Sequence, residues 1–292
     1  SLFRRFSRQI SSLLNKDHLE EQSFLKMSLP SQKDTYGCVS ADSSKIRHLS
    51  DEDFTSELKA ALVGWRSNRV RGIWFHCSKM DSRFIPILVE HGFEFHHAQP
   101  QYCTLTRWLP EDAPSTLPRY PHMHIGCGGI VVDAEGRLLM MREKKGRYLG
   151  WKFPGGLADP NENIYETASR EVKEETGVDA EGIAVLSFRQ VNSAQWKDTG
   201  DIYFLIVMKP KDESKKDVTP CATEAADAKW MTRSEIDGLS DELFHNTLRK
   251  TLKTYDNWVK CGSKGLVVEQ SNSPLRRHVQ MYTFAVDFSP RM

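Results

Sequence analysis

Apolar residues recur at intervals of three and four positions after Ser50, and this spacing predicts an amphipathic helix. Ser50 can cap the helix, because a serine hydroxyl accepts a hydrogen bond from a free backbone N–H group. Shorter apolar runs predict strands over Gly72–His76, Phe93–His97 and Tyr102–Trp108, and a second helix is expected over Asp81–His91. The order helix, strand, helix, strand, strand predicts a small α+β layer.

Two adjacent histidines lie on one of these predicted strands. Successive residues of a strand point to opposite faces, so we expect His96 and His97 to face apart and to share no metal ion. The segment also carries no glycine-rich phosphate loop and no catalytic cluster. We therefore assign the histidine pair a structural role.

A second block of elements follows a proline-rich segment. Four prolines within Leu109–Pro121 predict a stiff linker between two domains. Beyond the linker, the apolar pattern predicts strands and then a closing helix, over His122–Val132, Arg137–Met141, Ala184–Gln190, Asp201–Met208, Ala226–Met231 and Ser240–Val259. We therefore divide the chain into residues 1–33, a small domain at 34–110, a linker at 111–121, a second domain at 122–260 and a C-terminal extension at 261–292.

The start of the chain has a distinct composition. Residues 1–16 are basic, rich in serine and free of acids, with apolar residues at helical spacing. This composition is typical of a mitochondrial transit peptide, and a disordered basic tail is the alternative. The six cysteines of the chain are scattered without a CxxC pair, which indicates reduced thiols in an intracellular protein. We therefore expect a cytoplasmic or mitochondrial location.

Composition and charge narrow the class of partner. Hydrophobic residues make up 39% of the chain and charged residues 27%, as in globular proteins. The net charge is +1, so no overall field favours a nucleic acid or a membrane surface. No apolar run approaches the roughly 18 residues of a transmembrane helix. We expect neither kind of partner, and a homodimer is left open.

One acidic stretch carries the chemistry. Asn163 and Glu166 have the spacing of a capping box, so a helix should begin directly after Asn163. Glu171, Glu174 and Glu175 stand at positions i, i+3 and i+4 of that helix, which places three carboxylates on one face. Like charges so placed repel one another, whereas a divalent cation turns the repulsion into affinity. Mg²⁺ is the natural candidate because it prefers oxygen ligands, and Mn²⁺ is the substitute.

The same stretch resembles the Nudix box. Gly156 is followed after five residues by Glu162 and, after seven more, by REVKEETGV, which matches every defined position of that pattern. The preceding Phe153-Pro154-Gly155 adds to the match, and Gly177 should end the helix. The resemblance to Nudix hydrolases implies an α/β/α sandwich over residues 122–260, within an α+β protein, that hydrolyses a diphosphate with the help of a metal ion.

The resemblance also implies a role for each residue of the box. Glu162 and Arg170 would pair and brace the loop against the helix. A further carboxylate, as metal ligand or general base, is expected from a loop beyond the box, where Glu224 is the candidate and Asp201 and Asp227 compete with it. The metal ligands would be the carbonyl oxygen of Gly156 and the carboxylates of Glu171, Glu174 and Glu175.

Substrate contacts are expected just before the box. Arg142 and Arg147 belong to a cationic loop that would complement phosphates, and a solvated loop is the alternative. Trp151 and Phe153 have rings that would stack on a nucleobase, although core packing accounts for them equally well.

The first domain resembles the pre-Nudix domain of the subgroup that includes the fibroblast growth factor antisense protein. The resemblance implies an acetyltransferase-like fold without an evident acetyl-CoA site. It lies in Trp65-Arg66-Ser67, Ser82-Arg83-Phe84-Ile85, Gly92-Phe93, Phe95-His96-His97-Ala98, Leu105-Thr106 and Trp108-Leu109.

These observations predict a Mg²⁺-dependent pyrophosphatase that hydrolyses a nucleoside diphosphate linked to another moiety. ADP-ribose and NADH are the leading substrates and would give AMP and a phosphorylated product. The NADH-type signature SQPWPFPxS is absent, however, and Ser193 stands where one ADP-ribose group has a proline. A diphosphoinositol phosphate or capped-RNA substrate is one alternative. The other is a binding or regulatory protein that acts through its first domain.

Overall fold

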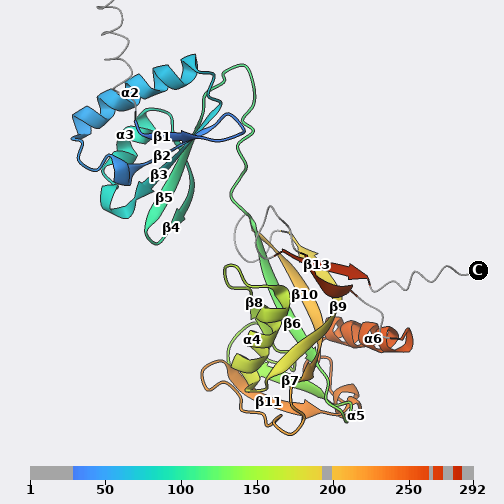
Figure 1. Cartoon of the computed structure of the whole chain (residues 1–292). Helices are drawn as coiled ribbons and strands as arrows, with labels where there is room; N and C mark the ends of the chain where they lie inside the picture. The colour runs from blue at the N-terminus through green and yellow to red at the C-terminus, as the bar shows by residue number, and fades with distance from the viewer. Residues whose placement is uncertain (1–28, 193–198, 263–265, 272–278, 285–292) are drawn as a thin grey trace, which may run out of the picture. The chain divides into compact units, whose positions relative to one another are not determined.

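The computed structural model describes residues 29–192, 199–262, 266–271 and 279–284 (Figure 1). The chain forms two compact units that divide between Pro121 and His122. The predicted transit peptide, the segment around Ser193 and most of the C-terminal extension lie outside the described residues. No helix in the described ranges is long and apolar enough to cross a membrane.

The first unit is a mixed sheet with the strand order β1-β2-β3-β5-β4. As predicted, the long helix begins after Ser50, whose side-chain oxygen accepts a hydrogen bond from the backbone N–H of Asp53. The apolar stripe of this helix packs with the sheet and the second helix in one core. The elements are β1 (Ser31–Lys33), β2 (Val39–Asp42), α2 (Asp51–Ser67), β3 (Gly72–Ser78), α3 (Phe84–Glu90), β4 (Glu94–Gln99) and β5 (Tyr102–Trp108).

Two expectations for this unit are corrected. The second helix is shorter than predicted, because a 3-10 turn over Lys79–Asp81 precedes α3. The two histidines do not face apart: Nδ1 of His96 lies 2.7 Å from Nδ1 of His97. The pairing of β4 with β5 shifts register between Phe95 and His97, and such a bulge interrupts the alternation of faces on which the expectation depended.

The second unit contains a sheet with the order β13-β12-β9-β10-β6-β8 and a smaller pair, β11-β7. β10 runs parallel to β6 and antiparallel to β9. The elements are β6 (Met123–Val131), β7 (Leu138–Glu143), β8 (Gly155–Leu157), α4 (Ile164–Thr176), β9 (Ala180–Val191), β10 (Gly200–Pro210), β11 (Ala225–Met231), α5 (Arg233–Asp237), α6 (Asn246–Lys260), β12 (Leu266–Ser271) and β13 (Val279–Phe284).

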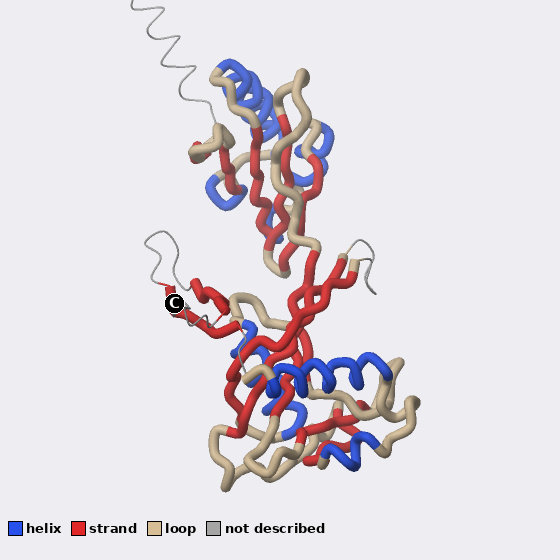
Figure 2. Tube along the Cα trace, turned by 90° about the vertical axis from the view of Figure 1, so that its right-hand side faces the viewer, coloured by secondary structure: helices blue, strands red, loops and turns tan. Residues whose placement is uncertain are grey.

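Helices cover both faces of the larger sheet (Figures 1 and 2). Val131 of β6 packs in one core with Val172 of α4. Its neighbour Ile130 packs in another core with Leu252 of α6. Successive strand residues point to opposite faces, so α4 and α6 lie on opposite sides of the sheet. The second unit therefore has the mixed α/β/α arrangement that was predicted.

Some elements of this unit differ from the prediction. The closing helix begins at Asn246 rather than Ser240, because His245 caps it through a hydrogen bond from the N–H of Thr247. α5 and the short strand β8 were not predicted. In the C-terminal extension, β13 pairs with β12, and Leu266 of β12 meets Val185 of β9.

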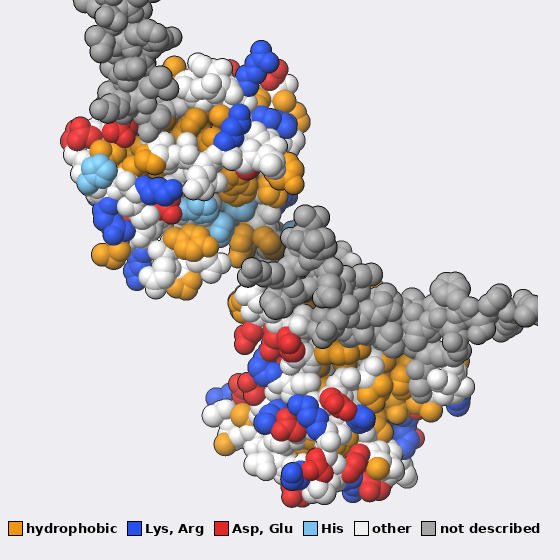
Figure 3. Space-filling view, in the orientation of Figure 1, with side chains coloured by type: hydrophobic (Ala, Val, Ile, Leu, Met, Phe, Trp, Pro, Cys, Tyr) orange, Lys and Arg blue, Asp and Glu red, His pale blue; other side chains and the backbone are white. Residues whose placement is uncertain are grey.

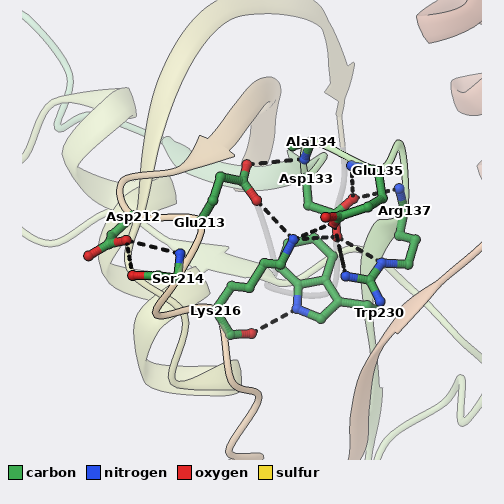
Figure 4. A network of polar contacts seen from close by, with 9 residues as sticks. All are labelled: Asp133, Ala134, Glu135, Arg137, Asp212, Glu213, Ser214, Lys216 and Trp230. Carbon is green, nitrogen blue, oxygen red and sulfur yellow. Dashed lines mark hydrogen bonds and ion pairs between the residues drawn. The ribbon is translucent and has the colours of Figure 1, made fainter.

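A polar network ties the β6–β7 turn to the loop that follows β10 (Figure 4). The buried carboxylate of Asp133 accepts hydrogen bonds from Nε of Arg137 at 2.8 Å and from Nζ of Lys216 at 3.1 Å. Lys216 also contacts Glu135 and Glu213. Burial alone would raise the pKa of Asp133, but hydrogen bonds from the Arg137 backbone and side chain and from Lys216 outweigh it and hold that pKa low.

Candidate active site

α4 begins and ends where the sequence predicts. The backbone N–H of Asn163 donates to Glu166 at 3.0 Å, which completes the capping box. Gly177 ends the helix in the left-handed conformation, with φ of 78°. The three predicted carboxylates differ in environment: Glu175 is buried, the Glu171 side chain is 15% exposed, and the Glu174 side chain is 59% exposed.

Two of these carboxylates lie against the backbone of β8. The N–H of Gly155 donates to Oε2 of Glu175 at 2.6 Å. The carboxylate of Glu171 lies 2.6 Å from the position that a Cβ on Gly156 would occupy. A side chain at Gly156 would displace Glu171, so the glycine permits the close approach of helix and strand.

The carboxylates of Glu171 and Glu175 share their nearby cations, Arg170 and Lys152, with other acidic side chains. Burial raises the pKa of Glu175 to about 7, and the negative charges of Glu171 and Glu143 add to the rise that Lys152 and the Gly155 N–H oppose. Burial likewise raises the pKa of Glu171, against the effect of Arg170. A divalent cation would relieve this excess of negative charge, so the donor set fits a hard metal ion.

The fit rests on a smaller set than the predicted ligands. Within the described part of the chain, no three His, Cys, Asp or Glu side chains are arranged to hold a metal ion. Glu174 turns its carboxylate to Arg170, with Oε2 at 3.1 Å from the guanidinium. The geometry therefore brings together Glu171, Glu175 and the backbone at Gly156, and it leaves Glu174 at the periphery.

Arg170 links the box loop to the helix. Its guanidinium donates to Glu162 at 2.7 and 2.8 Å, to Glu171 at 2.8 Å and to the carbonyl oxygen of Leu157 at 2.9 Å. The hydrogen bonds from Arg170 lower the pKa of Glu162 to about 2. The ion pair expected between Glu162 and Arg170 is present and holds the loop in place.

Two charged residues near the helix were not predicted. Nζ of Lys152 contacts the carboxylate of Glu143 and lies 3.8 Å from that of Glu175. Met141 bridges to Lys152 across the sheet, which brings the strand end at Glu143 beside the lysine. Lys152 stands directly before the FPGG turn, which is a sequence signal. The approach of Glu143 depends on pairing between distant segments and has no local signal.

Glu224 and its competitors occupy three different environments. Glu224 is exposed on the turn before β11, and among the described residues its carboxylate makes no hydrogen bond or ion pair. The backbone of that turn reaches the end of α4, because the N–H of Cys221 donates to the carbonyl oxygen of Glu175 at 3.0 Å. Asp201 on β10 lies 3.7 Å from Arg189, and Asp227 is exposed on β11.

The predicted substrate contacts divide into buried and exposed residues. Trp151 is 6% exposed and Phe153 is 4% exposed, and both belong to the core beneath α6. A nucleobase could stack on either ring only after core neighbours moved, so the stacking role is corrected to a packing role. Nε of Arg142 donates to the carbonyl oxygen of Leu149 at 2.9 Å, while Arg147 is exposed.

Comparison with known proteins identifies the family. The NUDIX domain model matches residues 122–255, and a Nudix hydrolase domain model matches residues 29–109. Nudix hydrolase 8 of Arabidopsis thaliana is 35% identical over 71% of this chain, which spans 56% of that protein. Nudix hydrolase 5 of the same plant is 32% identical over 78% of this chain and 74% of its own length. Nucleoside diphosphate-linked moiety X motif 6 of Homo sapiens is 35% identical over 71% of this chain and 66% of its own length. The chain belongs to the Nudix hydrolase family.

Proposed function

We propose that the chain is a divalent-metal-dependent pyrophosphatase that hydrolyses a nucleoside diphosphate linked to a second moiety. The observation that carries the proposal is the pair of poorly neutralised carboxylates, Glu171 and Glu175, against the glycine strand β8. Mg²⁺ is the proposed ion and Mn²⁺ its substitute. The printed name of the human relative, which refers to a nucleoside diphosphate-linked moiety, supports the substrate class.

Each residue of the proposed site would have a distinct role in binding the metal ion or in positioning its ligands. Glu171, Glu175 and the carbonyl oxygen of Gly156 would hold the metal ion, and Glu174 would complete the set if its side chain left Arg170. A bound divalent ion supplies neutralisation of the bridging phosphates and a water of lowered pKa. Arg170 keeps the box loop and Glu162 in place beside the ligands.

A general base is proposed from the carboxylates beyond the box. Glu224 remains the first candidate, because its turn is hydrogen-bonded to the end of α4. Glu143 is the second, because its charge acts directly on Glu175. Either carboxylate would accept a proton from the attacking water and hand it to solvent.

ADP-ribose and NADH are the proposed substrates, with AMP as the shared product. Lys144, Lys145 and Arg147 are exposed in the loop before the box and provide positive charge for phosphates. On the face shown in Figure 3, acidic and basic side chains are interspersed over the second unit. This mixture favours a small substrate over a long polyanion.

The first unit is proposed to be an acetyltransferase-like pre-Nudix domain at residues 34–110, followed by a linker to 121 and a catalytic domain at 122–260. A mixed sheet covered by α2 and α3 supports that domain type. No residue given a chemical role lies in this unit, so we propose that it supports rather than performs the reaction.

The test is release of AMP from ADP-ribose, NADH, coenzyme A, Ap4A and ATP at matched concentrations, with Mg²⁺ and with Mn²⁺. ADP-ribose or NADH should lead the panel. A tenfold lead for ATP or Ap4A, about 1.4 kcal/mol in the barrier, would overturn the substrate assignment. No turnover on any of the five would favour a diphosphoinositol phosphate, capped RNA or a regulatory role.

Glu175→Gln tests the proposed site itself. It should lower kcat at least about a hundredfold, or roughly 2.7 kcal/mol, without lowering the melting temperature of the metal-free protein. Stability is retained because the neutral amide removes a carboxylate that burial already disfavours. A variant that keeps most of its metal-dependent rate would place the active site elsewhere.

A further inference from the structure

The glycine strand β8 is contacted from both faces of the sheet. A Cβ on Gly156 would lie 2.6 Å from Glu171, on the side of α4. A Cβ on Gly155 would lie 2.6 Å from the hydroxyl oxygen of Tyr203, on the opposite side. The alternation follows from strand geometry, in which neighbouring residues face apart. Tyr203 and the proposed metal ligands therefore hold the same short segment between them.

Tyr203 lies along a row of glycines. It belongs to β10 and pairs with Gly126 of β6, where a Cβ would lie 2.7 Å from Cδ2 of the ring. A Cβ on Gly128 would lie 2.7 Å from the hydroxyl oxygen. The ring thus runs from Gly126 past Gly128, and its hydroxyl ends at Gly155. A side chain at Gly126 or Gly128 would push the ring away, whereas one at Gly155 would first meet the carbonyl oxygen of Cys127.

A cation lies over the same ring. Cζ of Arg189 is 5.0 Å from the ring centroid of Tyr203, and the two residues are direct partners in the pairing of β9 with β10. The guanidinium is also 3.7 Å from the carboxylate of Asp201, two residues before the tyrosine. Contact with an arginine restricts the ring, because the π-face attracts the positive charge.

β8 needs such support. It has three residues, two of them glycine, and among the described strands its one partner is β6, at the edge of the sheet. Glycine has the largest backbone freedom of any residue, so an edge strand of this kind is weakly fixed by its own hydrogen bonds. Its position nevertheless decides where the Gly155 N–H meets Glu175 and where the Gly156 carbonyl oxygen points.

We propose that Tyr203 is a positioning residue that presses the Gly155–Gly156 backbone into the geometry required by the metal centre. The inference rests on the proposed metal site. The hydroxyl oxygen makes the contact at Gly155, and the ring holds it there along Gly126 and Gly128. Loss of the ring should therefore remove the support, and loss of the hydroxyl alone should weaken it.

The experiment compares Tyr203→Ala with Tyr203→Phe in the full chain. Mn²⁺ affinity is measured by electron paramagnetic resonance, and hydrogen exchange of residues 154–157 is measured in the metal-free protein. We expect Tyr203→Ala to weaken Mn²⁺ binding by at least about tenfold and to speed exchange at Gly155. Tyr203→Phe keeps the ring but loses the contacting oxygen, so both values should fall between those of the alanine variant and the wild type. Tyr255→Ala, a half-buried tyrosine of α6, is the control for lost aromatic packing.

A size exchange gives an independent test if the alanine variant does not fold. Gly128→Ala should displace the ring and speed exchange at Gly155, and adding Tyr203→Phe should restore part of the protection because the clashing oxygen is gone. Unchanged exchange in Tyr203→Ala or Gly128→Ala, or an equal loss of Mn²⁺ affinity in Tyr255→Ala, would overturn the inference. A wild-type chain that binds no Mn²⁺ while its exchange follows the predicted order would contradict the proposed function alone.

Discussion

Glu143, Lys152 and Glu175 form a set in which one ammonium group serves two carboxylates. Lys152 contacts Glu143 directly and lies 3.8 Å from Glu175. Removing either acid would leave the lysine to the other. Lys152 therefore links the end of β7 to the end of α4. Glu143 is thus a second candidate for the general base, in addition to Glu224.

Glu224→Gln and Glu143→Gln distinguish the two candidates for the base. The variant that removes the base should lose about 10²–10⁴-fold in kcat with little change in KM, because a general base acts only in the transition state. Initial rates under identical metal and substrate conditions provide the comparison, with Asp201→Asn as the matched control. A larger loss for Asp201→Asn than for both glutamates would contradict the assignment.

At the scale of elements, features set by neighbours in the sequence could be predicted, whereas contacts between distant segments could not. The capping box at Asn163 and the stop at Gly177 depend on neighbours within one turn, so the bounds of α4 followed from the sequence. The placement of Glu171, Glu174 and Glu175 on this helix could be predicted for the same reason. The approach of Glu143 depends on how distant strands pair, and the bulge at His96 depends on a register that no local pattern fixes.

The network around Asp133 shows what the β6–β7 turn contributes to the second unit. Its buried carboxylate is held by Arg137 and Lys216 (Figure 4). Asp133→Asn should destabilise this unit by about 1–3 kcal/mol, because it weakens hydrogen bonds to charged groups. Thermal unfolding checks the prediction, and Asp212→Asn on the same loop, where the side chain is 45% exposed, is the control.

The pH dependence of this effect has a definite sign. The pKa of Asp133 is lowered in the folded state, so its contribution is present above the unfolded pKa near 3.9 and is lost as the pH falls through the folded value. The stability difference between Asp133→Asn and the wild type should therefore shrink in acid. A difference that stays constant down to low pH would mean that the charge of Asp133 is unimportant.

At the scale of the whole molecule, the two units have separate cores. Every residue with a proposed chemical role lies after Pro121. A truncated chain that begins at Pro118 should therefore keep metal-dependent hydrolysis if it remains folded, with kcat within about threefold of the full chain. Circular dichroism verifies folding, and AMP release measures activity. A folded but inactive truncated chain would show that the first unit completes the site.

The contact between His96 and His97 implies that the two rings share protons unequally. Nε2 of His96 donates to the carbonyl oxygen of Pro118 at 2.8 Å, and one of the two Nδ1 atoms must lack a hydrogen in order to accept from the other. The ring of Tyr120 stacks on His97 at 4.8 Å, so one unprotonated nitrogen helps to fasten the linker. Burial lowers the pKa of His97, and the charges of His96 and His76 lower it further.

Acidification should loosen this fastening. The pKa of His97 is lower in the folded state than in the unfolded state, so the unfolded state binds this proton more readily. The stabilisation is therefore lost as the pH falls below the unfolded pKa near 6.5. Between pH 7.5 and 5.5, amide exchange in residues 115–121, corrected for intrinsic rates, should therefore accelerate in the wild type. It should stay flat in His97→Phe, which keeps a ring for Tyr120 but cannot titrate, while the exposed His48→Gln control behaves like the wild type. The mobility of residues 115–121 would thus increase as the pH falls.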